Sequence, residues 1–393
     1  MRLLLVDEPY VSPSLRKAIA ALGLPLVLTA AARGLGFTAT FTTLDEDEAV
    51  ALAERAGRLQ VLTTSENALG WLAKKLPRAP FQDAIRSFKD KALFREHTAA
   101  LDPGFFFRRV SLGDIELLSH EDLPLPLILK PRVGFFSMGV VRIAHPRDWA
   151  IASALLQAEF ERYRSLYPEV VLGTRDFLLE ALIPGEEFAI DAYLDEHGAP
   201  VILGIWKHAF ASEEDMGDRV YSTSRELIVR HLGEFTAYLH RIAELTSARD
   251  MPLHVELRRS ETGAIGAIEV NPMRFGGWCT TGDLTKSAYG HDPYQLFFDG
   301  GSPDWTGTLA AMGARTFSIV VLNNSTGHDG RDIAAFDYES LAARFAKPLE
   351  LRRADFERFP LFGFLFLETP PERLGELDWI LHSDLTEFVT LRG

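Results

Sequence analysis

The chain has 393 residues, about two to three times the size of a typical domain, so its length predicts two or three domains. With 47% hydrophobic and 24% charged residues, its composition is typical of a folded globular protein and excludes intrinsic disorder and fibrous repeats. The 55 acidic and 41 basic residues give a net charge of −14, which argues against an extended nucleic-acid interface and against an anionic membrane surface, so any polyanionic ligand must be held by local positive groups.

The first eighty residues have the pattern of a small open sheet with mostly parallel strands. Apolar runs rich in branched residues indicate strands, and apolar residues at helical spacing indicate the segments between them. The predicted strands are 3–6, 25–28 and 60–63, and the predicted helices are 14–22 and 65–72. Ser65 is a suitable N-cap for the second helix. The prolines at 77–80 interrupt the pattern, so we place the first domain at residues 1–80.

Residues 81–300 alternate strands with long helices whose apolar residues recur every three or four positions. The predicted strands are 127–130, 177–180, 187–194, 201–206, 253–257 and 265–270, and the predicted helices are 148–166 and 226–248. A Gly-Gly-Ser-Pro cluster at 300–303 ends this region. Strands at 317–322 and 362–367 and a helix at 372–381 then predict a small C-terminal α+β domain at 301–393. The predicted fold class is α/β (α+β).

The single cysteine, Cys279, can form neither an internal disulfide nor a Cys-rich zinc site, which favours a reducing compartment. The apolar run at 3–6 is too short for a signal segment, and no run reaches the length of a membrane span. We therefore expect a cytoplasmic protein that does not bind a membrane.

Several familiar nucleotide and hydrolase motifs are missing from the sequence. No stretch fits the P-loop pattern, and Gly34-Leu35-Gly36 lacks the third glycine of a dinucleotide-binding fingerprint. Neither a HExxH zinc motif nor a nucleophile elbow occurs, so metalloprotease and α/β-hydrolase chemistry have no support. A different kind of ATP site remains open.

The segment that follows Lys130 has the composition of a phosphate-binding loop. This lysine ends a predicted strand, and the loop after it contains Gly134, Ser137 and Gly139. The glycines allow close approach of the backbone, and the N–H groups and the hydroxyl can donate to phosphate oxygens while Lys130 supplies positive charge. An ordinary hairpin with a lysine at its edge would explain the same residues.

A second set of polar residues alternates along two predicted strands. Glu256 and Arg258 share one face of the first strand. Glu269 and Asn271 share one face of the next strand. If the strands pair, two carboxylates and an amide oxygen come together, and these are hard ligands suited to Mg²⁺. The alternative is that they are solvent-facing residues of an antiparallel sheet.

Between these two segments, a predicted strand is interrupted at Pro184-Gly185 and then resumes. A short connector of this kind can hold adenine, because its backbone can bond the edge of the base while Leu182 and Ile183 provide an apolar wall. Glu187 can then reach the ribose hydroxyls. Hairpins of this composition are also common in proteins that bind no nucleotide.

In this order, the three segments resemble the ATP-grasp superfamily, and the first eighty residues look like its pre-ATP-grasp domain. The resemblance implies an ATP-grasp fold in which ATP and Mg²⁺ lie between two lobes of residues 81–300. It implies that Lys91, in the pair Asp90-Lys91, and Lys130 contact the nucleotide phosphates. The remaining implied residues are the hinge acid Glu180, the connector residues Ala181, Leu182 and Ile183, the ribose acid Glu187, and the metal ligands Glu256, Glu269 and Asn271. The Glu-x-Asn-Pro pattern is the most specific part.

The resemblance further implies an ADP-forming ligase that activates a carboxylate as an acyl phosphate and joins it to an amine, such as an amino acid, or to a thiol. ATP and Mg²⁺ would be its cofactors and small-molecule carboxylates and amines its partners, while a homodimer stays open. Arg274 and Arg258 are the candidates to hold the carboxylate, together with the amides of Gly276-Gly277. Lys207 is a further candidate for contact with the γ-phosphate.

Two other functions fit the same sequence. A kinase-type phosphotransferase would use the same nucleotide site, and a nucleotide-binding module would use it without turnover. The intact set of lysines and metal ligands argues against the module. Cys279 is either a nucleophile or a small buried structural residue. We expect the structural role, because ATP already activates the carboxylate.

Overall fold

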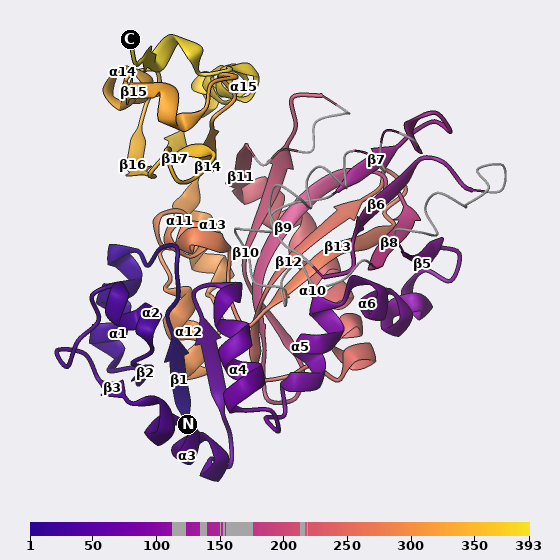
Figure 1. Ribbon diagram of the computed structural model, residues 1–393, viewed down its shortest axis with the longest axis vertical. Helices are drawn as coiled ribbons and strands as arrows, with labels where there is room; N and C mark the ends of the chain where they lie inside the picture. The colour runs from indigo at the N-terminus through magenta and orange to yellow at the C-terminus, as the bar shows by residue number, and fades with distance from the viewer. Residues whose placement is uncertain are drawn as a thin grey trace.

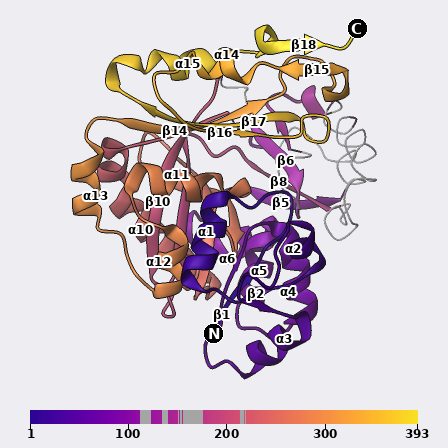
Figure 2. The same ribbon diagram turned by 90° about the vertical axis from the view of Figure 1, so that its left-hand side faces the viewer.

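The computed structural model describes residues 1–111, 123–133, 140–149, 151, 154, 176–212, 217 and 219–393. Within these residues the strands form one eight-stranded, two four-stranded and one two-stranded sheet (Figure 1). The view in Figure 2 shows the C-terminal segment as a layer across one end of the molecule, with the N-terminal sheet at the opposite end. The chain therefore runs from one end of the molecule to the other.

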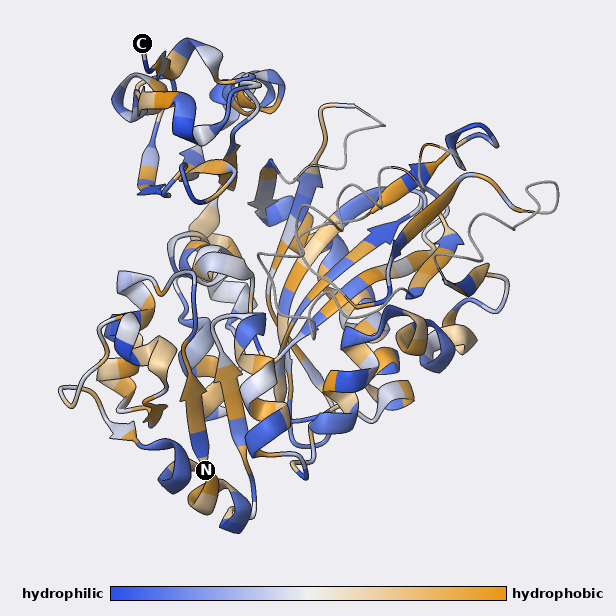
Figure 3. Cartoon of the chain, viewed as in Figure 1, coloured by the Kyte–Doolittle hydropathy of each residue, from blue (hydrophilic) through white to orange (hydrophobic). Residues whose placement is uncertain are grey.

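The N-terminal sheet has the strand order β3-β2-β1-β4, and each neighbouring pair is parallel. Its strands are β1 (Arg2–Leu5), β2 (Leu26–Val27), β3 (Thr43–Leu44) and β4 (Gln60–Thr63). The helices of this part are α1 (Pro13–Leu22), α2 (Ala30–Gly34), α3 (Glu46–Arg55), η1 (Glu66–Ala68) and α4 (Leu69–Lys75). Leu3 and Leu5 belong to one apolar core and Leu4 to another, so both faces are covered, as is usual for a parallel sheet. Figure 3 shows hydrophobic residues along β1 and β4. The predicted open parallel sheet is confirmed.

The chain then passes through three short helices into a small antiparallel sheet of order β5-β8-β6-β7. The helices are α5 (Gln82–Lys89), α6 (Lys91–Thr98) and η2 (Ala99–Leu101), and the strands are β5 (Phe107–Ser111), β6 (Leu127–Pro131), β7 (Val141–Ile143) and β8 (Asp176–Ala181). Val110, Leu127 and Phe177 lie in its apolar core. This sheet places Lys130 near the end of β6.

The large sheet has the strand order β13-β12-β9-β10-β11-β14-β17-β16, and its neighbouring pairs are antiparallel. Its strands are β9 (Glu186–Leu194), β10 (Pro200–Ala209), β11 (Val220–Ser224), β12 (Met251–Arg259), β13 (Ile265–Pro272), β14 (Thr316–Asn323), β16 (Pro348–Arg353) and β17 (Leu361–Thr369). Helix α10 (Arg225–Thr246) covers one face, where the rings of Phe188 and Phe235 are 5.2 Å apart. Because side chains alternate along a strand, Glu187 faces the other side.

The C-terminal segment continues this large sheet. Strand β14 pairs with β11, so the sheet extends across residue 300, the predicted domain boundary. The division into domains at residues 80 and 300 remains our proposal. The remaining elements are η3 (Gly277–Cys279), α11 (Thr280–Tyr289), α12 (Pro293–Asp299), α13 (Trp305–Met312), η4 (Gly330–Asp332), β15 (Ile333–Phe336), α14 (Tyr338–Ala342), η5 (Pro371–Arg373), α15 (Gly375–His382), η6 (Thr386–Phe388) and β18 (Val389–Leu391).

The predicted elements beyond residue 176 each match a helix or strand of the structure to within a few residues. Most of the helix predicted at 148–166 lies outside the described residues. The predicted turn at 260–263 is confirmed, since the Gly263 N–H donates to the Ser260 carbonyl over 3.0 Å. Among the described residues, no helix is long and apolar enough to cross a membrane.

We predict that Gly185→Ala destabilises the protein by about 2 kcal/mol or more. Gly185 lies between β8 and β9 with φ of 107°, and a Cβ atom there would collide with the Arg259 carbonyl. Gly70→Ala is the matched control, because Gly70 is an exposed residue of α4 with open space around it. Urea unfolding of both variants measures the effect, and a Gly185→Ala variant as stable as the wild type would contradict it.

Candidate active site

A buried group of three charged side chains holds Lys130. Glu180 lies on β8 beside β6, and its Oε1 is 2.6 Å from Lys130 Nζ. Arg95 of α6 donates from Nε to Glu180 Oε2 over 2.6 Å. Burial alone would raise the pKa of Glu180, but the positive charges of Arg95 and Lys130 hold that pKa at about 2. Glu180 is thus ionised, and it fixes the ammonium group of Lys130.

Lys91 and Lys130 converge on the same strand. Lys91 begins α6, and its backbone N–H donates to the Arg132 carbonyl, which ties this helix to the end of β6. Its Nζ is 3.1 Å from Glu269 Oε1 on β13, and Lys130 Nζ donates to the Ile268 carbonyl over 3.3 Å. The structure therefore brings the two predicted phosphate-binding lysines together.

The predicted metal ligands lie side by side on β12 and β13. Glu256 is directly opposite Glu269, and His254 is directly opposite Asn271. With its amide group turned to face the carboxylates, Asn271 donates to Glu269 Oε1 over 3.2 Å. Within the described part of the chain, no group of three or more His, Cys, Asp or Glu side chains could hold a metal ion. Two carboxylates and one amide nevertheless fit Mg²⁺, which needs few protein oxygens when phosphates and water complete its shell, and the Asn271 amide would turn its oxygen toward a bound ion.

A carboxylate from the N-terminal part also reaches this strand. Glu66 Oε1, in η1, is 2.7 Å from Nη2 of Arg274, and the carboxylate also pairs with Lys89. The Asn271 amide, oriented as above, donates to Glu66 over 2.5 Å. Burial opposes ionisation of Glu66, but Lys89 and Arg274 lower its pKa to about 2. Arg274 is therefore already charge-paired beside the predicted metal ligands.

Asp191 supports the site from β9. It accepts hydrogen bonds from the Gly276 N–H over 3.1 Å and from the Thr281 hydroxyl. The Nδ1 atom of His254 is 2.7 Å from Asp191 Oδ1, and its Nε2 is 3.6 Å from Glu256 Oε1. Burial lowers the pKa of His254, but its hydrogen bonds to these two carboxylates outweigh burial and raise the pKa to about 9. Asp191 thus joins the metal-ligand strands to the loop after Asn271.

Glu187 lies at the other end of this face. Its Oε2 accepts from Arg258 Nε over 2.9 Å, and its Oε1 is 3.1 Å from His208 Nδ1. Burial opposes a low pKa for Glu187, but His208 and Arg258 lower it. Arg258 also donates to the Ile183 carbonyl over 3.1 Å. The structure therefore joins the predicted ribose acid to the predicted connector.

Arg258 and Arg274 are not brought together. Arg258 pairs with Gly266 near the start of β13, whereas Arg274 follows the end of that strand. Lys207 is also separate from the other predicted residues: it lies opposite Phe188, on the α10 side of the large sheet, and its Nζ is 2.5 Å from Glu186 Oε1.

The structure describes the predicted connector but not the glycines and serine of the predicted phosphate-binding loop. Gly134, Ser137 and Gly139 lie outside the described residues. The N–H groups of Ala181 and Leu182 donate to the carbonyls of Phe106 and Pro126, which fixes the course of the connector. Recognition of adenine by this connector stays a prediction.

The expected buried position of Cys279 is confirmed. Burial and the negative charge of Asp283 raise the pKa of the Cys279 thiol to about 11. A thiol of this kind is protonated at neutral pH and is a poor nucleophile.

Sequence reasoning missed Glu66, Arg95, Asp191 and His254. His254 carries a signal, because it lies two residues before Glu256 and therefore on the same face of the strand. The contacts of the other three join residues far apart in the sequence, which no local pattern records.

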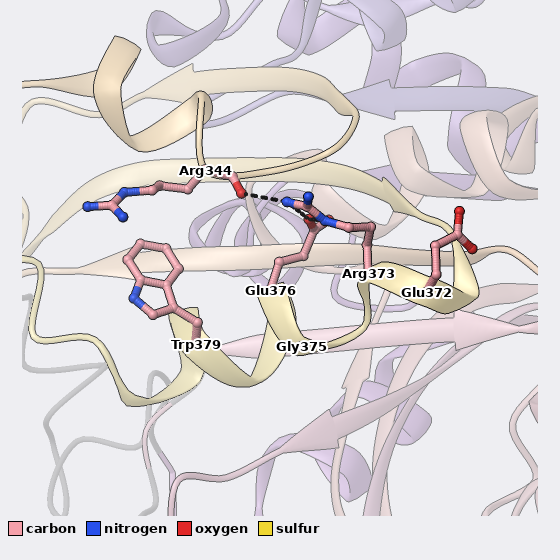
Figure 4. Close-up of a pocket in the computed structure, with 6 residues that line it drawn as sticks. All are labelled: Arg344, Glu372, Arg373, Gly375, Glu376 and Trp379. Carbon is pink, nitrogen blue, oxygen red and sulfur yellow. Dashed lines mark hydrogen bonds and ion pairs between the residues drawn. The ribbon is translucent and has the colours of Figure 1, made fainter.

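A cavity of about 330 Å³ lies elsewhere, in the C-terminal segment (Figure 4). Arg344, Glu372, Arg373, Gly375, Glu376 and Trp379 line it. Its buried acid, Glu376, already accepts from the Ala346 N–H and the Thr369 hydroxyl. None of the predicted site residues contributes to this cavity, so the chemistry of the site is argued from the large sheet.

Comparison with known proteins agrees with this arrangement. Residues 123–282 match the family model of the ATP-grasp domain. A search of curated proteins found no match. Among solved structures, an L-amino acid ligase from Bacillus licheniformis is 18% identical with a TM-score of 0.66, covering 100% of this chain and 99% of that chain.

Two further solved structures share the fold. An N5-carboxyaminoimidazole synthase from Aspergillus clavatus, in complex with ADP and 5-aminoimidazole ribonucleotide, is 15% identical with a TM-score of 0.63 and 98% coverage of each chain. The biotin carboxylase domain dimer of the 2-oxoglutarate carboxylase from Hydrogenobacter thermophilus, in complex with MgADP, is 14% identical with a TM-score of 0.61, covering 100% of this chain and 90% of that chain.

The two lysines beside the carboxylates of β12 and β13 agree with these matches. Residues 123–282 form an ATP-grasp domain, and the chain over its whole length shares the fold of the L-amino acid ligase. The resemblance seen in the sequence is thereby confirmed.

We predict that Arg95→Met lowers the free energy of unfolding by about 3 kcal/mol, because it leaves buried Glu180 with Lys130 alone. Glu180 then has Lys130 as its remaining cationic partner and should hold that ammonium group more tightly. Lys130 is thus less available to the phosphates, and the rise in melting temperature caused by MgATP should shrink. Thermal unfolding with and without MgATP measures both effects. Arg109→Met is the control, because the ion pair of Arg109 with Glu96 is exposed. Equal melting temperatures and equal MgATP shifts in Arg95→Met and wild type would show that the group has no such role.

Proposed function

We propose that this chain is an ATP-dependent, ADP-forming ligase that activates a carboxylate as an acyl phosphate and joins it to an amine, such as an amino acid. The observation that carries the proposal is the convergence of Lys91 and Lys130 on the strand that holds Glu269. Two cations beside hard oxygen ligands suit phosphoryl transfer, in which the protein mainly positions groups and offsets charge.

In the proposed reaction, a carboxylate oxygen bonds to the γ-phosphorus of ATP while the bond to the bridging oxygen breaks and ADP leaves. The amine nitrogen then bonds to the acyl carbon, phosphate leaves with the C–O electron pair, and the nitrogen loses a proton. Lys91 and Lys130 hold the phosphates, and Arg274 holds the carboxylate. Bound by Glu256, Glu269 and Asn271, Mg²⁺ would offset the negative charge of the phosphates.

The comparisons support ATP and Mg²⁺ as the cofactors and a small-molecule carboxylate as the substrate class. Solved structures of the same fold contain ADP or MgADP, and one is named as an L-amino acid ligase. We assign adenine to the connector at 181–183 and ribose to Glu187. We place the reaction in the cytoplasm, because the chain has one cysteine and the reaction consumes ATP.

We predict that Glu269→Gln lowers turnover by two or more powers of ten, on the order of 3 kcal/mol in the barrier. The variant keeps the shape of the side chain and removes the charge that binds the metal. The Mg²⁺ concentration needed for the ATP-induced thermal shift should rise as well, which is a readout independent of turnover. Glu261→Gln, in the exposed turn after β12, is the control. Near-normal activity of Glu269→Gln at saturating Mg²⁺ would make Glu269 a bystander.

The acyl phosphate can be trapped with hydroxylamine. Wild-type enzyme with MgATP, hydroxylamine and each common L-amino acid in turn, then other small carboxylic acids, should form hydroxamate in step with ADP for the correct carboxylate. Lys130→Ala should abolish both products, because it removes the cation that Glu180 positions for the phosphates. Lys74→Ala, an exposed lysine of α4, should form both at the wild-type rate.

The products separate the alternatives. A stable phosphorylated product with no hydroxamate would indicate a kinase-type phosphotransferase. Binding of MgATP without ADP formation across all the acids would indicate a nucleotide-binding module. AMP and pyrophosphate would show that the γ-phosphoryl route is wrong.

A further inference from the structure

The loop from Met273 to Cys279 joins β13 to α11 and has an unusual backbone. Met273, Trp278 and Cys279 have φ values of 69°, 56° and 58°, in the left-handed region that residues with side chains rarely adopt. Such a conformation persists only where the surrounding structure fixes it. The loop carries Arg274 and Gly276, so the contacts that fix it bear directly on the proposed carboxylate site.

Arg352 contacts this loop from the C-terminal segment. It lies on β16, and its Nη1 donates to the Trp278 carbonyl over 2.5 Å. Its Nη2 is 2.6 Å from Asp283 Oδ2 in the first turn of α11. The planar, forked guanidinium can serve a carbonyl and a carboxylate at once, whereas a lysine offers a single ammonium group. Arg352 therefore holds the loop and the start of the following helix together.

The surroundings of Arg352 bury this contact. Its guanidinium carbon is 4.7 Å from the centre of the Tyr10 ring and 4.8 Å from that of Phe366. Arg352 is 5% exposed and Asp283 is 6% exposed. The exposed Glu350 on the same strand adds a second carboxylate at 3.0 Å. A buried ion pair of this kind is costly to break, because one charge is left uncompensated.

A residue of the N-terminal part of the chain also contacts Asp283. The hydroxyl of Ser12, which is fully buried, donates to Asp283 Oδ1 over 3.0 Å and also caps α1. On the other side of the loop, Asp191 binds the Gly276 N–H and the Thr281 hydroxyl. Three residues that are far apart in the sequence thus fix the loop at 273–279, which lies between the carboxylates of Asp191 and Asp283.

We propose that Arg352 is a positioning residue for the substrate carboxylate. From the C-terminal segment it fixes the backbone at 273–279, so that Arg274 and the Gly276-Gly277 amides keep one arrangement before the carboxylate binds. This inference rests on the proposed function. It adds a residue of β16 to a site whose other proposed residues lie on other elements.

Amide hydrogen exchange of the full-length protein tests the loop without a substrate. In Arg352→Lys, which keeps the charge and loses the fork, exchange at 273–283 should be at least tenfold faster than in wild type, while exchange at 251–272 should be unchanged. Arg353→Met is the matched control, because Arg353 is the exposed neighbour on β16 and lies over the Tyr338 ring. If Arg352→Lys does not fold, Ser12→Ala removes one partner of Asp283 and should also speed exchange at 273–283.

Kinetics with hydroxylamine as acceptor separates positioning from stability. The KM for the carboxylate should rise at least tenfold in Arg352→Lys, while kcat and the Kd for MgATP should change less than threefold. Unchanged exchange at 273–283, an unchanged KM, or an equal loss of MgATP affinity would each overturn the proposal. If wild-type enzyme forms no hydroxamate, the ligase function and the carboxylate role both fail, and the exchange data alone decide whether Arg352 fixes the loop.

Discussion

Lys130 is buried in an ion pair with Glu180, and the arrangement of the site depends on this contact. It is 3% exposed, and burial favours the neutral form of a lysine, so it lowers the pKa of Lys130. Glu180 opposes this effect at 2.6 Å, and Arg95 in turn keeps Glu180 ionised. Because phosphate recognition by a lysine depends on its positive charge, helix α6 and strands β6 and β8 have to meet at this point.

The register of the large sheet is the second constraint. Glu256 faces Glu269 and His254 faces Asn271, and β9 adds Asp191 opposite His254. A shift of one residue in any of these strands would turn its polar side chains toward the α10 core. Rigid strands therefore hold the predicted metal ligands, while the carboxylate is assigned to a loop that needs outside contacts to keep its shape.

Local patterns predicted the strands and the alternation of Glu256, Glu269 and Asn271, because side-chain direction in a strand repeats every two residues. Local patterns do not show which of two adjacent residues in a strand points toward the site. The sequence predicts a phosphate contact for Lys207, but pairing with β9 puts His208 beside Glu187 and Lys207 on the α10 side. The Gly-Ser-Pro cluster after residue 299 indicated a boundary, yet nonlocal pairing of β14 with β11 carries the sheet across it.

The formal charges around β13 explain how an acidic chain can hold anions. Lys89, Lys91 and Arg274 contact Glu66 and Glu269, which gives +3 − 2, or +1. Lys130 and Arg95 contact Glu180, which gives +2 − 1, also +1. His254 lies between Asp191 and Glu256, which adds +1 − 2, or −1, so these residues together leave one positive charge in a chain whose net charge is −14. Removing Glu66 or Glu180 would raise the local charge but leave buried cations uncompensated, so the acids are what allow so many cations to be buried together.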